Sequence, residues 1–194
     1  MFYFKKLIIL FLFMVLSLNA KENIYLDKKD LYNYDYRIFV GLNTSISYIR
    51  SNVSLDRSML SYGAHIGMPI FWGNELIFKN TINNTSNFKI NQKSLILNIP
   101  FSSRSSRQAY FGVEYGEGEF KWNYGDMISH NLNKRIIKDT FYGIHIGKRY
   151  KFTRNYYVRI ELDAIKYNYK SESLQEDIDT NFSLGFNYGF EYRF

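Results

Sequence analysis

The chain has 194 residues, a formal net charge of +7 at pH 7, 19% aromatic residues and no cysteine. The lack of thiols excludes disulfide bonds, cysteine-based metal sites and a lipid-anchoring cysteine. A basic chain can bind nucleic acid, but its N-terminus carries an export signal, so we expect no nucleic-acid partner.

Residues 1–20 have the features of a secretory signal peptide. Lys5 and Lys6 supply positive charge, and the run Leu7–Leu18 is apolar throughout apart from one serine. This run is shorter than the ~20 residues that a membrane-spanning helix needs. We therefore expect residues 1–20 to be removed on export. Residues 21–35 are polar, lack periodicity and are predicted to form a periplasmic lead.

From residue 36 onward, apolar and polar residues alternate in segments separated by polar stretches. A strand places successive side chains on opposite faces, so alternation of this kind predicts β-strands. The predicted strands are, in chain order, 36–48, 60–72, 75–82, 90–101, 108–118, 140–150, 156–169 and 180–194.

Two local irregularities stand out among these segments. Trp72–Glu75 contains Gly73-Asn74 and is predicted to form a tight hairpin turn. In the seventh segment the alternation changes phase near Ile165, which we interpret as a bulge or as the strand leaving the membrane.

The last segment shows the clearest alternation. Its large apolar or aromatic residues are Phe182, Leu184, Phe186, Tyr188, Phe190, Tyr192 and Phe194, and small, polar or charged residues separate them. One face therefore carries seven bulky side chains and no charge. A strand that faces lipid on one side and a polar interior on the other needs this pattern.

Eight such segments predict an all-β fold, an eight-stranded antiparallel transmembrane β-barrel with up-and-down meander order over residues 36–194. The connections after the second, fourth and sixth segments are short, and the others are mostly longer. Outer-membrane barrels have short turns on the periplasmic side and longer loops outside. We expect a monomer in the bacterial outer membrane with both termini in the periplasm. Eight strands enclose an interior that side chains can fill, so we expect no open water channel.

In this pattern the chain resembles the small eight-stranded outer-membrane barrels of the OmpA/OmpX type. The C-terminus carries the most specific part of the resemblance, because Phe190, Tyr192 and Phe194 alternate up to the last residue. The resemblance implies that the barrel-assembly machinery reads these residues as a signal. It also implies a membrane-lipid and lipopolysaccharide environment.

Charged residues occupy the face that would point into the barrel. They are Arg37, Lys79, Glu114, Arg149, Arg159, Glu161, Asp163, Glu191 and Arg193. Unpaired charges in a narrow interior are costly, so we expect these side chains to pair with one another. The alternative is a gated path for small solutes, in which one pair opens.

Two similar hexapeptides, Tyr62–Gly67 and Tyr142–Gly147, each place a histidine, His65 or His145, on the inward face of opposite strands. This similarity is consistent with duplication of a four-stranded unit. Two histidines at similar depth could bind a metal, but no third ligand has a recognisable spacing. We expect hydrogen-bonded interior histidines, no metal site and no cofactor.

A lipid A-modifying enzyme is a further alternative, because some small barrels cleave or transfer lipid acyl chains. Such enzymes need a serine with a neighbouring base on the lipid-facing surface. His65 and His145 are predicted to point inward. His130 adjoins Ser129 in the longest loop, but adjacent strand residues face opposite ways. We therefore predict no catalytic residues.

The longest predicted loop, residues 119–139, is the candidate binding surface. It contains Trp122, Tyr124, Lys134 and Arg135, and binding residues concentrate in loops on rigid scaffolds. A host or envelope protein is the expected partner. The predicted function is that of a non-enzymatic outer-membrane barrel with a packed polar interior, which contributes to envelope integrity and presents loops for binding or adhesion.

Overall fold

The structure is a computed structural model that describes residues 36–50, 58–84, 88–104, 107–122, 136–168 and 181–194. The predicted signal peptide and periplasmic lead lie outside these residues.

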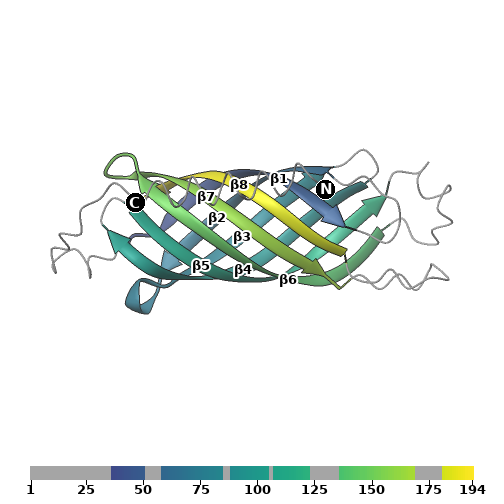
Figure 1. Ribbon diagram of the computed structural model, residues 1–194, viewed down its shortest axis with the longest axis horizontal. Coiled ribbons are helices and arrows are strands. Elements are labelled where there is room, and N and C mark those ends of the chain that lie inside the picture. Colours follow the sequence, from purple (N-terminus) through teal and green to yellow (C-terminus); the bar gives the residue numbers. More distant parts are fainter. Residues whose placement is uncertain (1–35, 51–57, 85–87, 105–106, 123–135, 169–180) are drawn as a thin grey trace, which may run out of the picture.

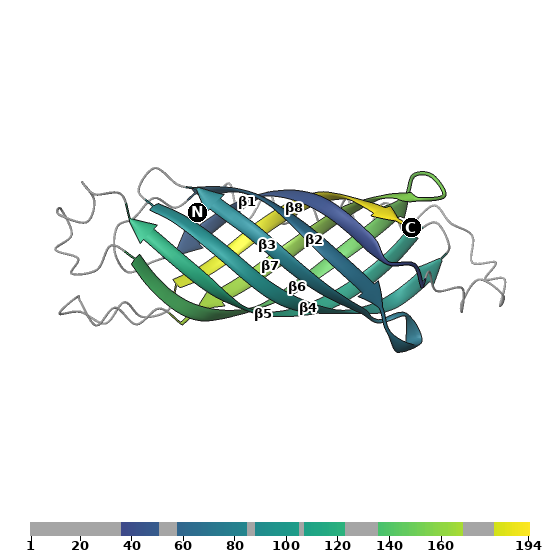
Figure 2. The ribbon, with the colours of Figure 1, turned by 180° about the vertical axis from the view of Figure 1, so that it is seen from behind.

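The described residues form one closed, tilted barrel in which each strand pairs with its neighbours in the chain (Figures 1 and 2). The strands are β1 (Phe39–Arg50), β2 (Ser58–Pro69), β3 (Glu75–Asn84), β4 (Phe88–Arg104), β5 (Arg107–Trp122), β6 (Ile136–Lys151), β7 (Tyr156–Tyr167) and β8 (Asn181–Arg193). All pairs are antiparallel, and β8 closes the ring against β1. The predicted fold class and strand order are confirmed.

The strands are staggered, and this stagger gives the barrel its tilt. Following register partners from Val40 through all eight strands leads to Phe182 and from there to Arg50, which lies ten residues further along β1. Closing a sheet requires such an offset, because tilted strands return to the start at a different height. Side chains that are distant in sequence therefore share a level inside the barrel.

Alternation holds along β8 as the sequence predicts. Ser183, Asn187 and Glu191 are buried inside, while Phe182, Phe190 and Phe194 are exposed on the outer wall. The same division runs round the ring. The exposed aliphatic side chains of the outer wall include Leu42, Ile46, Leu60, Ile66, Leu95, Val113, Ile144 and Ile146. These apolar residues face outward, whereas most charged residues of the strands' middle parts face inward.

Of the two interpretations of the phase change in β7, the bulge is wrong. The pairing of β7 with β6 and β8 continues without a shift from Tyr157 to Tyr167, and Ile165 and Tyr167 are both buried inside. The alternation in the sequence changes phase because two apolar residues occupy inward positions. A register shift occurs instead in the β4–β5 ladder between Pro100 and Ser102, where proline has no N–H to donate.

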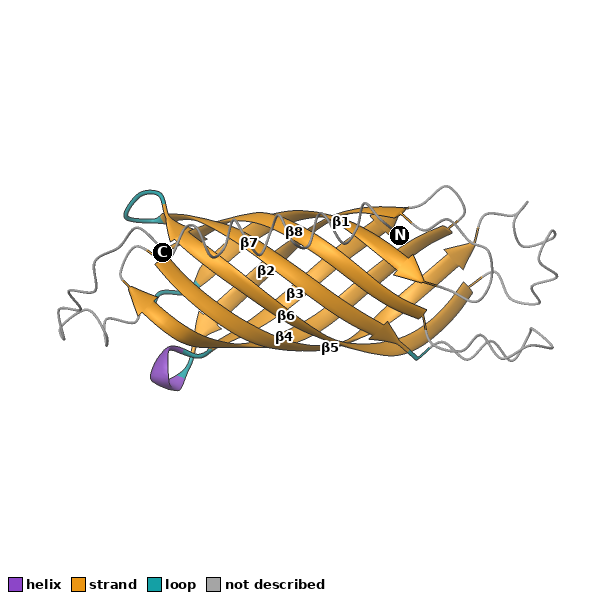
Figure 3. Cartoon of the chain, viewed as in Figure 1, coloured by secondary structure: helices purple, strands orange, loops and turns teal. Residues whose placement is uncertain are grey.

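The predicted turn at Trp72–Glu75 is displaced. A short 3-10 turn, η2 (Phe71–Gly73), projects from the barrel end (Figure 3), and Glu75 already belongs to β3 with its side chain buried inside. Trp72 and Gly73 have φ angles of 56° and 74°. These left-handed angles let the chain reverse, with Asn74 N–H donating to Phe71 O at 3.2 Å.

The loop end of the interior is apolar. Ile49, Met59, Ile90 and Phe120 come from β1, β2, β4 and β5 and are almost fully buried. Below them Phe141 and Tyr167 pack with ring centroids 5.7 Å apart. This apolar layer lies above the charged residues, together with the buried polar side chains of Ser61 and Asn83.

Among the described residues, no helix has both the length and the apolar character needed to cross a membrane.

Gly41 provides a test of how tightly the interior is packed. A Cβ atom at this position would lie 2.5 Å from Phe190 O and against the His65 ring. Overpacking of this kind typically costs about 1–3 kcal/mol. We therefore expect Gly41→Val to lower the urea midpoint for unfolding from lipid vesicles. Leu42→Val, one residue away on the outer wall, is the control and should change it little. Equal midpoints for both variants would contradict the packing.

Candidate functional site: the buried charge network

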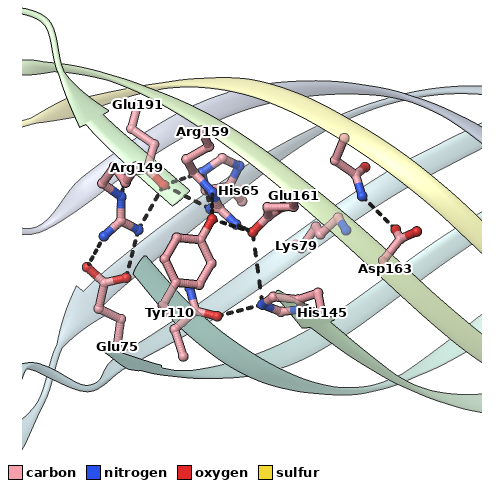
Figure 4. A network of polar contacts seen from close by, with 12 residues as sticks. His65, Glu75, Lys79, Tyr110, His145, Arg149, Arg159, Glu161, Asp163 and Glu191 are labelled. Carbon is pink, nitrogen blue, oxygen red and sulfur yellow. Dashed lines mark hydrogen bonds and ion pairs between the residues drawn. The ribbon is translucent and has the colours of Figure 1, made fainter. Parts of the chain in front are cut away.

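A network of charged side chains crosses the interior nearer the end with the short turns (Figure 4). Its cations are Lys79, Arg149, Arg159 and Arg193, and its carboxylates are Glu75, Glu114, Glu161, Asp163 and Glu191. They come from β3, β5, β6, β7 and β8 and point into the barrel because they occupy the inward positions of their strands.

Arg149 and Glu75 form the centre of the lower part of the network. The Arg149 guanidinium donates from Nη1 to Glu75 Oε1 at 2.9 Å and from Nη2 to Oε2 at 2.8 Å. Arg193 Nη2 donates to the same Glu75 Oε1 at 2.6 Å, and Arg149 Nε lies 2.7 Å from Glu191 Oε2. Two-pronged arginine–carboxylate pairs are strong and geometrically specific. The pair joins β3 to β6, which are not neighbours in the sheet.

Arg159 extends the network toward the middle of the barrel. Its Nη1 donates to Glu191 Oε1 at 2.8 Å, its Nη2 pairs with Glu161, and its Nε donates to the Tyr110 hydroxyl at 3.1 Å. The Tyr110 hydroxyl in turn donates to Glu161 Oε1 at 2.7 Å. Each of these buried groups therefore meets a partner of complementary charge or polarity.

Aromatic rings separate the guanidinium groups. Arg193 lies 4.6 Å from the Phe39 ring centroid, and Arg149 lies 5.5 Å from Phe39 and 5.2 Å from Tyr110. Contacts at these distances are attractive because the ring face is electron-rich. The rings also occupy space that water would otherwise fill. Phe39 is fully buried.

The two histidines occupy matching positions. His65 Nε2 lies 3.2 Å from Arg159 Nη1 and 3.4 Å from Glu191 Oε1, and His145 Nε2 lies 2.6 Å from Asn98 Oδ1. Each ring meets an aromatic ring edge-on at a centroid distance of 6.1 Å, Phe39 for His65 and Tyr110 for His145.

The described residues contain no group of three or more His, Cys, Asp or Glu side chains placed to hold a metal ion. The contacts of His65 and His145 are with polar and charged side chains of the network. This arrangement provides interior hydrogen bonding.

A smaller polar group lies above the histidines. Lys79 Nζ is 3.8 Å from Glu114 Oε1, which also accepts a hydrogen bond from Ser94 Oγ at 2.5 Å. Asp163 accepts from Asn187 Nδ2 at 2.6 Å. An interior cavity beside Lys79 and Glu161 has a volume of about 10 Å³, the space of about one water molecule. Little space is therefore left beside Lys79 and Glu161.

Arg37 lies outside the network. It precedes β1, and its guanidinium donates to Asn155 Oδ1 at 2.9 Å and to Arg154 O at 2.7 Å in the β6–β7 turn. The structure thus brings together the other eight predicted inward charges and places Arg37 at the barrel end.

Sequence reasoning missed Glu75 and Tyr110. Glu75 was placed where the predicted turn meets the third predicted strand and was not counted among the inward charges, although it shares the inward parity of Lys79. Tyr110 alternates with the outward residues Ala109 and Phe111, so its inward position could have been found. Its role between Arg159 and Glu161 depends on contacts across the barrel that alternation does not reveal.

The remaining predicted site residues fall into two groups. Phe190, Tyr192 and Phe194 lie on the outer wall, with Tyr192 and Phe194 ring centroids 5.1 Å apart. Trp122 ends β5, and Tyr124, Lys134 and Arg135 lie outside the described residues.

Replacing Arg149 tests how much the network contributes to the stability of the barrel. Arg149→Leu would leave the Glu75 and Glu191 carboxylates buried without their principal partner, a loss that typically costs about 3–5 kcal/mol. We expect the unfolding midpoint in urea to fall strongly, or the chain to fail to reach its heat-modifiable folded form. Lys148→Leu, the adjacent half-exposed position, should cost little. If the two variants were equally stable, the network would not contribute to stability.

Comparisons with known proteins agree on the fold. No protein-family model matches the sequence, and no curated protein sequence is similar to it. Among solved structures, Neisserial surface protein A (NspA) is similar with a TM-score of 0.63 at 14% identity, over 81% of this chain and 97% of that one.

Two further structures have the same architecture. Ail, the attachment invasion locus protein of Yersinia pestis, matches with a TM-score of 0.56 at 11% identity over 82% of this chain and 99% of Ail. Ail also matches in its complex with the heparin analogue sucrose octasulfate. The outer membrane protein OprG from Pseudomonas aeruginosa matches with a TM-score of 0.50 at 11% identity, over 85% and 99% of the two chains. This chain therefore has the fold of the small eight-stranded outer-membrane β-barrel proteins.

Proposed function

We propose that this protein is a non-enzymatic barrel of the bacterial outer membrane that contributes to envelope integrity and presents its longer loops for binding. The single observation that carries the proposal is the inverted distribution of side chains. Large apolar residues such as Leu42, Ile46 and Ile144 are more than half exposed, while Arg149 and Glu191 are 1% exposed. Water outside the barrel would favour the opposite distribution, and lipid outside favours this one.

The packed interior supports a structural role over transport. Buried ion pairs cross the barrel in its lower half, and the apolar layer of Ile49, Met59, Ile90 and Phe120 is buried toward its loop end. A solute path would require breaking several of these contacts at once. We therefore favour a closed barrel over the alternative of a small-solute pore.

The histidine contacts support a non-enzymatic function. A lipid-modifying enzyme needs its base next to a nucleophile at the lipid-facing surface. His65 and His145 are 6% and 4% exposed, and their ring nitrogens contact Arg159, Glu191, Asn98 and Glu161. His130 lies outside the described residues.

The loop end remains as the surface available for partners. In the proposed orientation both termini and the short turns are periplasmic, and the opposite strand ends, at Arg50, Asn84, Trp122 and Tyr167, lie on the cell exterior. Ail, which has the same fold, has been solved with a heparin analogue. By analogy of fold, we propose that residues of loop 123–135 and its flank, among them Trp122, Tyr124, Lys134 and Arg135, bind a host or envelope partner.

The assembly signal has a place in the same proposal. Phe190 and Phe194 are 54% and 66% exposed on the outer wall, on the strand that closes the barrel. We propose that the barrel-assembly machinery reads them before β8 pairs with β1.

Deleting residues 123–135 and joining β5 to β6 by a short Asn-Gly turn tests the binding role. We expect the variant to keep its heat-modifiable gel mobility and to lose most of its binding to host cells or envelope extracts. Replacing residues 85–87 with Gly-Ser-Gly in a second loop is the control. Unchanged binding by the deletion variant would refute the role of this loop.

Conductance in planar bilayers tests whether the barrel is closed. We expect the folded wild-type protein to give no channel steps at any applied voltage, because the interior is filled by the buried network. Regular steps from protein shown to be folded would favour the pore instead.

A further inference from the structure

Four lysines lie on the outer wall of β4, β5 and β6 toward the loop end. They are Lys89, Lys93, Lys121 and Lys138, and all four are exposed. Their neighbours along the strands, such as Ile90 and Phe120, are buried inside. Since successive strand residues point to opposite faces, these lysines point outward from the wall.

Two of the lysines have acidic neighbours in the sheet register. Lys138 Nζ lies 3.2 Å from Glu119 Oε2, its register partner across the β5–β6 ladder. Lys93 stands directly opposite Glu117 in the β4–β5 ladder. Opposite charges in directly facing positions stabilise a sheet. Lys138 and Lys93 therefore each have an acidic neighbour within the barrel.

Lys89 and Lys121 form a different pair. They are register partners of each other in the β4–β5 ladder, and their other register partners are Asn84 and Ile136. Like charges directly opposite in a sheet are destabilising. Glu119 lies two residues from Lys121 on the same face, but its carboxylate pairs with Lys138. Among the residues that the structure describes, positive charge therefore exceeds negative charge at this place.

The position of this pair along the barrel indicates what lies beside it. The outward apolar residues of β4 and β5 end at Leu95 and Tyr115, which are register partners. Lys89 and Lys121 each lie six residues further toward the loops, roughly 20 Å along tilted strands. In the proposed orientation this is outside the hydrocarbon layer, at the level of the outer leaflet's headgroups.

We propose that Lys89 and Lys121 form a binding site on the barrel wall for phosphate groups of lipopolysaccharide in the outer leaflet. Facing side chains in such a ladder have Cβ atoms about 5 Å apart, and each ammonium offers three donors, so one phosphate can bridge both lysines. Charge-assisted hydrogen bonds of this type are stronger than neutral ones. The phosphate supplies the negative charge that the sheet register lacks.

The wall position favours lipid over a soluble polyanion. Lys89 and Lys121 point sideways from the barrel, toward the lipids that surround it, and not along the axis above the loops. The proposal rests on the outer-membrane location, and it adds to that location a specific lipid and two residues that bind it.

Lipopolysaccharide binding by Lys89→Gln/Lys121→Gln tests the site. Folded wild-type and variant barrels in nanodiscs of zwitterionic phospholipid are titrated with lipopolysaccharide. We expect the variant to bind at least about tenfold more weakly, because both charge-assisted contacts to the phosphate are lost. Binding of the wild-type protein should also weaken with salt. Lys151→Gln/Arg154→Gln removes the same charge at the short-turn end and should leave binding unchanged.

Further measurements distinguish binding to lipopolysaccharide phosphate from binding to other anions. Dephosphorylated lipopolysaccharide should bind wild type as weakly as intact lipopolysaccharide binds the double variant. The proposal is overturned if the double variant keeps wild-type affinity, if dephosphorylation has no effect, or if sucrose octasulfate alone depends on these lysines. Failure to insert into any bilayer would refute the membrane location itself, and heat-modifiable mobility reports that outcome separately.

Discussion

The ladder between β1 and β8 closes the meander of strands into a ring. Its register partners run from Phe39 opposite Arg193 to Arg50 opposite Phe182. Within a bilayer no water is present to satisfy backbone N–H and C=O groups, so a sheet with open edges cannot stand there. Closure removes both edges at once. The Phe194 N–H extends the ladder by donating to Ile38 O at 3.0 Å.

Closure also determines what the interior must contain. A ring of eight strands encloses too little space for bulk water, so charged side chains that enter it must satisfy one another. Glu75, Glu191 and Glu161 alternate with Arg193, Arg149 and Arg159 through shared contacts. Phe39 and Tyr110 lie between the guanidinium groups. Most of these partners come from different strands, and the stagger of the ring brings those strands' residues to one level; Arg159 and Glu161 are both in β7.

The sequence was sufficient to predict the strands and the outer wall of the barrel, but not the contacts inside it. Alternation in Phe182–Phe194 depends only on the two-residue repeat of a strand, so the strands, their outward faces and the inward charges followed from it. Alternation became misleading at Ile165 and Tyr167, because apolar residues can point inward as well as outward. Alternation was not applied at Glu75, because this residue was also placed in the predicted turn, and its inward position was therefore missed.

Which charges meet could not be predicted for a physical reason. Arg149 and Glu75 are 74 residues apart and belong to strands that do not pair, so their contact depends on the stagger of the whole ring. That stagger depends on the register of all eight ladders, including the register shift between Pro100 and Ser102. Local patterns carry no information on it.

The central claim is that lipid touches the outer wall, and nitroxide labels on β8 test it most directly. The chain has no cysteine, so single cysteines at Leu184, Phe186 and Phe190 can each carry one label in vesicles. The account predicts that collisions with lipid-soluble oxygen exceed collisions with a water-soluble nickel reagent at all three positions, most of all at Phe186. A larger effect of the nickel reagent at Phe186, or shielding from both, would contradict it.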